Sequence, residues 1–399
     1  MAPDSHLGRR GPPSRKIRLT KMNNAFRHRT NEAAAAAAAA SSKRAERGSE
    51  MLRTRSASNR SKGILLGLTV ALWSAASYAE NIDLVGLNIG GAAFSGNVIP
   101  GKYKTNYFFP APGYFAKWKA KGIETIRFPI MWERLQPALN AELDEDYAEL
   151  IDQTLQQAAQ YDMRIILDIH NYARYRKQLI GTEAVPISAY ADLLERVAKR
   201  WKDEKGLYAY DIMNEPHGAD EYWPAAAQAG IDAIRKHDQK RPLLIEGNFW
   251  SSSYRWPKFN DPLLQLEDPS DKLIFSAHLY IDKHGSGHYK EPLEKNFDTM
   301  LGVKRVKPFI DWLIKHDKQG HIGEFGIPAD EPRYLEAMDN LLAYLQDHCI
   351  PITYWAAGSS WGKYKLSIEP TKDGRDRPQW EVLSKYVGQG DCSRIGPNR

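Results

Sequence analysis

The chain has 399 residues, of which 42% are hydrophobic, enough to bury one large core or two ordinary ones. Its formal charge of +6 and its pI near 9.0 are typical of proteins with an anionic partner such as nucleic acid. Residues 1–62, however, contain 15 Lys and Arg and only four acidic residues, a net charge of +11, so the remainder carries −5. We therefore expect no nucleic-acid binding by the folded part of the chain.

The first 79 residues read as a leader. Residues 1–50 are polar and basic with an alanine run, and we expect a disordered extension because they cannot bury a core. Residues 51–79 are typical of a secretory signal peptide, with an apolar stretch from Gly63 to Ala76 and cleavage after Ala79. The stretch is shorter than the about 20 residues of a membrane span, and an uncleaved anchor is the alternative. A start at Met51 would give an ordinary signal, and the expected location is secreted or periplasmic.

The chain contains two cysteines, Cys349 and Cys392. Export makes a disulfide between them possible. Such a bridge would close a loop of about 44 residues and stabilise the fold by roughly 4 kcal/mol on a chain-entropy estimate. The alternative is a buried Cys349 with Cys392 free in a loose tail.

From residue 80 onward, short β-type runs alternate with helix-like stretches. Several of the runs are almost continuously apolar, as in strands that are buried on both faces. The predicted strands are, in chain order, Leu84–Ile89, Glu124–Pro129, Arg164–His170, Ala209–Asn214, Leu243–Glu246, Leu273–His278, Gly320–Glu324 and Ile352–Ala356.

Between these runs, apolar residues recur at helical spacing. The predicted helices are Leu143–Tyr161, Tyr190–Trp201, Trp223–His237 and Tyr334–Leu345. Strand–helix alternation favours a parallel sheet, and eight such units in about 320 residues predict a single α/β domain, a (β/α)8 TIM barrel over residues 80–399. An open doubly wound sheet is the alternative, weakened because Gly86–Gly91 is not a GxGxxG phosphate loop.

Polar and aromatic residues collect at the carboxyl ends of the predicted strands. They are Arg127, His170, Asn171, Asn214, Glu215, His278, Tyr280, Glu324 and Trp355. In a barrel these strand ends converge on one cleft. Two glutamates across one cleft are what hydrolysis of a glycosidic bond requires.

Each of these residues taken alone has a plainer explanation. Asn214-Glu215-Pro216 could begin a helix, with Asn as the cap and Pro in the first turn. A single histidine or Trp355 is more often part of a core, and Arg127 could form a structural ion pair. Their joint occurrence at the same end of separate strands favours catalysis, because core packing does not require it.

Charge suggests a role for each glutamate. A nucleophilic carboxylate must stay ionised, and Arg127 and Tyr280 could stabilise Glu324 in that form. An acid/base group needs a higher pKa, which we expect for Glu215 beside the negative Glu324 and His278. A separation of about 5–5.5 Å between the two carboxyl groups would mean retention of configuration, and about 6.5–9.5 Å would mean inversion.

With these residues in place, the chain from Leu84 to Val387 resembles glycoside hydrolase family 5. The resemblance implies that Glu215 is the acid/base and Glu324 the nucleophile. It also implies that Asn214 binds the sugar 2-hydroxyl, Trp355 forms a platform under that sugar, Arg127 and Tyr280 hold Glu324, and His170 and His278 order the site. The stretches Trp132–Pro137, Asp168–Tyr175 and Asn214–Gly218 resemble the bacterial and fungal endo-β-1,4-glucanase branch, and we favour the bacterial one.

Aromatic residues just past the strand ends suit a sugar cleft, because the C–H faces of sugar rings pack on aromatic planes. We expect Tyr172, Trp250 and Trp361, together with Asn171 and Trp355, to bind substrate. Tyr175 and Trp256 are equally compatible with packing among loops.

His284 and His288 are a loose pair without a carboxylate partner at ligand spacing, so we expect no metal. No nucleotide loop or other cofactor site is visible in the sequence.

The sequence thus predicts a monomeric, exported, retaining endo-β-1,4-glucanase that acts on β-glucan without a stable membrane partner. A β-mannanase or xyloglucanase would use the same two glutamates and is the alternative among enzymes. A carbohydrate-binding barrel without activity is the alternative among binding proteins.

Overall fold

A computed structural model describes residues 83–389 and 392–397. The extension predicted for residues 1–50, the signal peptide predicted for 51–79 and the start at Met51 lie outside the described residues. No helix in the described part of the chain is long and apolar enough to cross a membrane.

The centre of the fold is a closed barrel of parallel strands in the order β1-β10-β9-β8-β7-β6-β3-β2. Its strands are β1 (Val85–Ile89), β2 (Thr125–Ile130), β3 (Arg164–Ile169), β6 (Leu207–Asp211), β7 (Leu243–Glu246), β8 (Leu273–Leu279), β9 (Gln319–Phe325) and β10 (Ile352–Ala357). All eight predicted strands are confirmed, and the closed barrel excludes the open doubly wound sheet.

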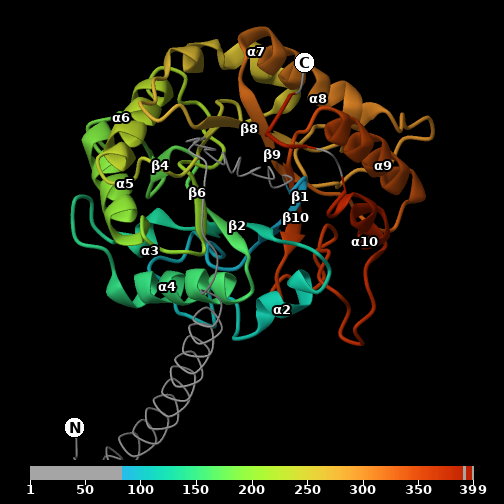
Figure 1. Ribbon diagram of the computed structural model, residues 1–399, viewed down its shortest axis with the longest axis horizontal. Coiled ribbons are helices and arrows are strands. Elements are labelled where there is room, and N and C mark those ends of the chain that lie inside the picture. The colour runs from blue at the N-terminus through green and yellow to red at the C-terminus, as the bar shows by residue number, and fades with distance from the viewer. Residues whose placement is uncertain (1–82, 390–391, 398–399) are drawn as a thin grey trace, which may run out of the picture. The chain divides into compact units, whose positions relative to one another are not determined.

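Helices surround the strands (Figure 1). They are α2 (Tyr114–Lys119), α3 (Trp132–Leu135), α4 (Glu145–Gln160), α5 (Ile187–Trp201), α6 (Trp223–Arg235), α7 (Trp256–Phe259), α8 (Leu301–His316), α9 (Pro332–Asp347) and α10 (Pro378–Leu383). The four predicted helices correspond to α4, α5, α6 and α9. The longest helix that the sequence analysis missed is α8, which contains Pro308 in its interior, a residue that usually interrupts a helical pattern.

The apolar periodicity of the helices has the expected cause. In α5, Leu193, Leu194 and Val197 are buried, whereas Lys199 in the last turn is exposed. The strands are buried on both faces, as their apolar runs predict, and all five residues of β1 are buried. Connections at the mouth are longer and carry a small antiparallel pair, β4 (Arg174–Tyr175) and β5 (Gln178–Leu179).

The amino-terminal end of the barrel, which we call the floor, contains a buried apolar cluster. Ile166, Ala209, Leu244 and Ile274, each from a different strand, form one buried cluster, and Ile395 of the carboxyl-terminal tail packs against it. The tail is held by backbone hydrogen bonds from Gly320 N to Gly396 O (2.9 Å) and from Gly396 N to Cys349 O (2.8 Å).

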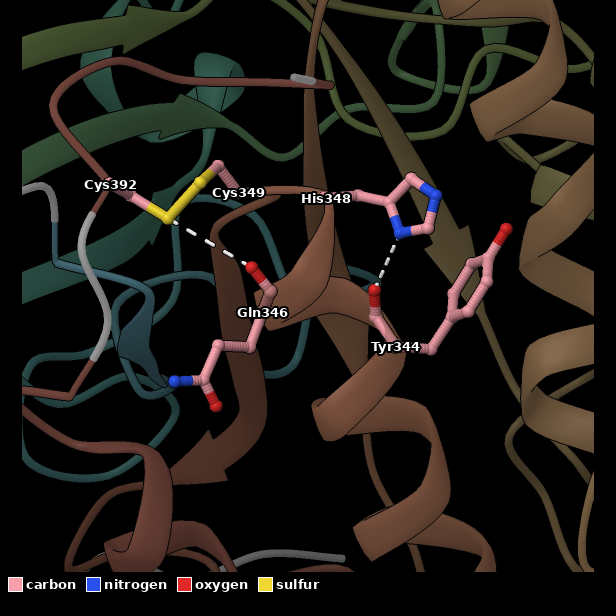
Figure 2. The surroundings of a disulfide bond; sticks show 5 residues. All are labelled: Tyr344, Gln346, His348, Cys349 and Cys392. Atoms are coloured by element: carbon pink, nitrogen blue, oxygen red, sulfur yellow. Dashed lines mark hydrogen bonds between the residues drawn. A yellow bond between two sulfur atoms is a disulfide. The ribbon is translucent and has the colours of Figure 1, made fainter. Parts of the chain in front are cut away.

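A disulfide between Cys349 and Cys392 ties this tail to the end of α9, which confirms the predicted bridge (Figure 2). Cys392 Sγ lies 3.9 Å from the carbonyl oxygen of Gln346 in the last turn of that helix. Both cysteines are buried and cluster with Leu84, directly ahead of β1. The bridge therefore closes the floor at the point where the barrel begins.

Candidate active site

The two predicted glutamates lie together at the carboxyl ends of the strands, which we call the mouth. Glu324 is in β9 and is 4% exposed, and Glu215 follows β6 and is partly exposed. One oxygen of Glu215, one nitrogen of His278 and one oxygen of Glu324 lie within 4.8 Å of one another. The barrel thus brings residues 109 positions apart in sequence into direct proximity.

Two glycines allow β9 to place Glu324. A Cβ on Gly323 would lie 2.8 Å from Ser276 Oγ and 2.9 Å from His278 Nε2. A Cβ on Gly326 would lie 2.1 Å from the carbonyl oxygen of Trp355. Glycine is required at both positions because neighbouring strands approach too closely for a side chain.

Both oxygens of Glu324 accept hydrogen bonds. Oε1 accepts one from Arg127 Nη1 (3.2 Å), and Oε2 accepts one from the Tyr280 hydroxyl (2.6 Å). Burial raises the pKa of Glu324 and Glu215 adds to the effect, whereas His278 and Arg127 lower it. Burial also raises the pKa of Tyr280 well above its usual value, so the phenol remains a donor.

The Asn214-Glu215-Pro216 segment turns Glu215 into the mouth. Glu215 has φ 45°, a left-handed conformation, and its backbone N–H donates to Glu246 Oε2 (2.6 Å). Its carboxyl Oε1 lies 2.8 Å from His278 Nδ1. The alternative of a helix start at Pro216 is wrong, since the next helix, α6, begins at Trp223.

Arg127 is the centre of a buried charge network. Its guanidinium is fully buried, and the surrounding acids raise its pKa well above the usual value although burial opposes the charge. Its partners within 3.2 Å are Asn88, Asp168, Asp211, Asn214, Glu246 and Glu324.

Three further acids of this network, Asp168, Asp211 and Glu246, are not among the predicted site residues, and each has no exposed surface. Burial raises the pKa of Asp211 well above its usual value, and the neighbouring charge of Glu246 adds to this. A signal was present in the sequence, because Glu246 is the last residue of its predicted strand, as Glu324 is of another. Asp168 and Asp211 lie inside predicted strands and not at their ends, so the strand-end pattern does not select them.

Asn214 and His170 complete the inner part of the site. Asn214 Oδ1 accepts from Arg127 Nη2 (2.8 Å), and its buried Nδ2 has no partner within the described chain. His170 Nδ1 lies 2.7 Å from Asp168 Oδ2, which fixes the ring. The imidazole of His170 is parallel to Trp355, with ring centroids 5.7 Å apart and an interplanar angle of 8°.

Aromatic side chains extend along the mouth. Trp250 is 46% exposed and stacks on His217 at 4.4 Å between centroids, and Tyr172 is 36% exposed with its hydroxyl 3.3 Å from His170 Nε2. Trp361 is half-buried, with its ring against the edge of Trp355 at 5.6 Å. On the Glu215 side, a cavity of about 600 Å³ is lined by Trp250, Phe249, Tyr254, Arg255, His278, Tyr280, His284 and His288, among others.

The structure corrects the expectation for Asn171 and decides the open alternatives for Tyr175 and Trp256 in favour of packing. Asn171 is 5% exposed and its amide is fully used, accepting from Trp132 N (2.8 Å) and donating to Glu133 Oε2 (2.7 Å), so it braces loops instead of facing the cleft. Tyr175 is buried with its hydroxyl on Gln136 O (3.0 Å). Trp256 has no exposed surface and packs on Phe309 in the outer core.

The close grouping of Glu215, His278 and Glu324 also has the spacing of metal ligands. The charges around it disfavour a cation, because the Arg127 guanidinium lies 3.2 Å from Glu324 and both oxygens of that carboxylate are already engaged. The arrangement suits proton transfer and nucleophilic attack without an ion.

Comparison with known proteins agrees with this geometry. Residues 86–360 match the family model described as cellulase, glycosyl hydrolase family 5. The chain is 31% identical over 325 residues to a probable endo-beta-1,4-glucanase B of Neosartorya fischeri, covering 80% of this chain and 95% of that protein.

Solved structures are also similar. One is the Pseudomonas stutzeri endoglucanase Cel5A in complex with cellobiose, 48% identical with a TM-score of 0.77, covering 80% of this chain and 98% of that one. Another is an endo-beta-1,4-glucanase from Xanthomonas axonopodis pv. citri, 32% identical with a TM-score of 0.72, covering 77% and 98%. Since the family model spans most of the chain and the barrel carries the two facing glutamates, this protein belongs to glycosyl hydrolase family 5, the cellulase family.

Proposed function

We propose that this chain is a retaining endo-β-1,4-glucanase in which Glu324 is the nucleophile and Glu215 the general acid/base. The observation that carries the proposal is the separation of the two carboxylates, whose facing oxygens lie within 4.8 Å. Retaining glycosidases hold their two carboxyl groups about 5–5.5 Å apart, whereas inverting ones leave about 6.5–9.5 Å for a water molecule. Facing oxygens within 4.8 Å of each other leave little room for a water molecule, which supports direct attack by a carboxylate.

The hydrogen bonds support the assignment of the nucleophile. Both oxygens of Glu324 accept from fixed donors, Arg127 and Tyr280, an arrangement that stabilises a carboxylate and not a carboxylic acid. Burial pulls the other way, since it raises the pKa of Glu324. The two fixed donors favour the ionised form of Glu324, and the role of proton donor then falls to Glu215.

Glu215 has the surroundings of an acid/base. One of its oxygens faces His278 Nδ1 at 2.8 Å, and the other has no hydrogen-bond partner in the described chain. Its side chain is 17% exposed, against 6% for Glu324, and it borders the large cavity at the mouth. It can therefore hold a proton and present it to a bound substrate.

The remaining residues would position the sugar. Asn214 has its Oδ1 occupied by Arg127, so its unpaired Nδ2 is available to donate to a 2-hydroxyl. Trp355, supported from one side by the parallel ring of His170, would lie under the sugar being cleaved. Trp250, Tyr172 and Trp361 would bind neighbouring rings along the cleft.

The reaction then follows in two displacements. Glu324 attacks the anomeric carbon while Glu215 gives its proton to the leaving oxygen, which breaks the glycosidic bond and forms a glycosyl ester. Glu215, now ionised, takes a proton from water, and the hydroxide oxygen displaces Glu324 with net retention. Fixed donors on Glu324 lower the cost of returning that group to a carboxylate in the second step.

The similarity to endo-β-1,4-glucanases supports β-1,4-glucan as the substrate. We place the chain in the bacterial branch, because the Pseudomonas stutzeri structure is 48% identical and the Neosartorya fischeri relative 31%. A β-mannanase or xyloglucanase is the second candidate, since both would use the same two glutamates. A binding protein without activity would not need Arg127 and Tyr280 on Glu324.

We also infer that residues 80–399 form the catalytic domain, that residues 51–79 are a signal peptide and that the protein is an exported monomer. The disulfide between Cys349 and Cys392 supports export, because such bridges persist in oxidising compartments. A mature amino terminus at Glu80, determined on protein secreted from the native host, would establish the cleavage after Ala79. Retention of the leader in the mature protein would contradict it.

The deciding experiment follows new reducing ends and viscosity on carboxymethylcellulose, mixed-linkage glucan, xyloglucan and galactomannan, with Glu324→Gln as the control. A rapid fall in viscosity on the glucans, absent in the variant, is the expected result. Activity confined to galactomannan would keep both glutamates and replace the substrate. No hydrolysis of any of the four polymers would favour the carbohydrate-binding protein without activity.

A further inference from the structure

Glu246, the last residue of β7, makes contacts that the two-glutamate mechanism does not use. It has no exposed surface. Oε2 accepts the backbone N–H of Glu215 at 2.6 Å, and Oε1 lies 2.8 Å from His278 Nε2 and 2.9 Å from Arg127 Nη2. A single buried carboxylate thus contacts the backbone of the acid/base and the imidazole that touches its side chain.

These contacts determine which imidazole nitrogen exchanges a proton. An ionised carboxylate only accepts hydrogen bonds, so His278 Nε2 must carry a proton and donate it to Glu246. The other nitrogen, Nδ1, lies 2.8 Å from Glu215 Oε1. One proton is shared across that second contact, either on Nδ1 as imidazolium facing a carboxylate, or on Glu215 facing a neutral imidazole.

We propose that Glu246 is a positioning residue for the acid/base step, holding the Glu215 backbone in place and keeping the Nε2 proton on His278 so that Nδ1 shares its proton with Glu215. The proposal rests on the proposed role of Glu215 as acid/base. In the first displacement the shared proton goes to the leaving oxygen, and in the second a proton taken from water restores it. The count of protons in Glu246, His278 and Glu215 is therefore the same after each turnover.

The charges around Glu246 support a permanently ionised group. Burial alone would raise its pKa, but His278, Arg127 and the amide of Glu215 outweigh burial and lower it to about 2. Burial opposes the charge on His278, yet Glu246 and Glu324 raise the pKa of that imidazole well above its usual value. The charged and titratable groups that interact with Glu246 are Arg127 from β2, Asp211 from β6, Glu215 through its amide, His278 from β8 and His321 from β9. Asp168 and Glu324 lie on the other contacts of Arg127.

The sign of the effect of Glu246 follows from its charge. A negative charge beside His278 favours retention of the shared proton. Its removal must therefore lower the pH at which the His278–Glu215 pair loses that proton. That pH sets the alkaline limb of kcat/KM, because the proton is needed for the first displacement.

The test is the pH profile of kcat/KM for the full-chain Glu246→Gln variant on mixed-linkage glucan. Glutamine keeps an oxygen for the Glu215 amide while removing the charge. We expect the alkaline limb to move down by about one to two pH units. The matched control is Asp268→Asn, which removes a buried carboxylate paired with Arg235 at 2.7 Å in the outer layer, without contacting His278, and its alkaline limb should stay in place.

A second readout separates this role from a structural one. An aryl cellobioside with a dinitrophenyl leaving group needs little help from an acid, so Glu246→Gln should lose at least about tenfold more kcat/KM on the glucan than on this substrate. If Glu246→Gln does not fold, Glu246→Asp, which keeps the charge on a shorter side chain, should lower kcat while leaving the alkaline limb unmoved.

An unmoved alkaline limb in Glu246→Gln, or equal losses on both substrates, would overturn the proposal. An alkaline limb that moves in Glu246→Asp as well would also overturn it, because the charge would then not be the cause. Failure of the proposed function has a different signature, since Glu215→Gln would then retain activity on the glucan whatever Glu246→Gln does.

Discussion

The two ends of the barrel are built from different chemistry. At the mouth, one fully buried guanidinium, Arg127, lies among four carboxylates that come from separate strands. At the floor, the same strands contribute an aliphatic cluster around Ile166 and Leu244, covered by Ile395 and tied by the Cys349–Cys392 bridge. Two strands contribute both kinds of side chain: Ile166 and Asp168 lie in β3, and Leu244 and Glu246 lie in β7.

Because of this difference, the floor mainly stabilises the barrel, whereas the mouth carries the proposed chemistry. Burial of aliphatic groups and a covalent tie stabilise the barrel at the floor, where no chemistry is proposed. Charges at the mouth cost desolvation energy, which only a complete set of partners offsets. Substitutions at the floor should thus change stability and leave turnover unchanged. Substitutions at the mouth should lower turnover, and should lower stability only where they leave buried charges without their partner.

The largest expected effect at the mouth is on turnover. Glu324→Gln removes the proposed nucleophile while keeping its shape, and activity on mixed-linkage glucan should fall by about 10⁴-fold or more. Its thermal unfolding should remain close to that of the parent, because glutamine keeps one oxygen for Arg127 and its amide N–H can donate to the Tyr280 hydroxyl oxygen. Residual activity above a hundredth of the parent would contradict the assignment.

Arg127→Gln is the substitution at the mouth that should lower both turnover and stability. It leaves Asp168, Asp211, Glu246 and Glu324 facing one another without a cation. We expect a loss of about 3–5 kcal/mol in the free energy of unfolding, measured in urea, together with loss of activity. The matched control is Arg235→Gln, which removes a buried pair with Asp268 in the outer layer and should lower stability while sparing turnover. Parent-like stability of Arg127→Gln would show that the network does not depend on its cation.

Cys392→Ser should lower stability at the floor and spare the mouth. The two cysteines are 43 positions apart in sequence. Opening the loop that they close should lower the free energy of unfolding by about 2–4 kcal/mol. Specific activity at 25 °C should match the parent, and a reducing agent should lower the melting temperature of the parent but not that of the variant. A loss of turnover with unchanged stability would instead connect the bridge to the mouth.

His321, a buried residue at the floor, should make the stability of the fold depend on pH. It is buried between the hydroxyls of Ser276 and Thr353, and burial lowers its pKa to about 3. The unfolded chain takes up the same proton near pH 6.5, so stability is lost as pH falls from about 6.5 towards 3, with a slope of up to about 1.4 kcal/mol per unit.

Urea unfolding between pH 7 and pH 4.5 measures this slope. His321→Gln should show a shallower loss of stability than the parent over that range. His284→Gln, a substitution on an exposed loop, serves as the control and should keep the parental slope. Identical slopes for the parent and His321→Gln would contradict a neutral, buried His321.

The comparison also shows how far sequence patterns reach. The alternation of apolar runs predicted all eight strands, and Leu243–Glu246 was predicted with the bounds that the structure gives it. Helix α8 was missed because Pro308 interrupts its pattern, and the packing of α8 on its neighbours outweighs that local preference. Trp256 and Tyr175 follow strand ends, as substrate-binding aromatics do, yet they turn into the core. Side-chain direction in a loop depends on partners that are distant in sequence.

What the order of residues alone determines here is the fold and the pair of glutamates. Strand period, helix spacing and the breakers Pro216 and Gly326 are local properties, and local properties can be read from one stretch of chain. The tertiary structure decides the distance between Glu215 and Glu324, the ionisation of His278 and Glu246, and the packing of Ile395 against the floor. Each of these depends on through-space distance and on burial between strands far apart in sequence, and neither quantity is carried by any single segment.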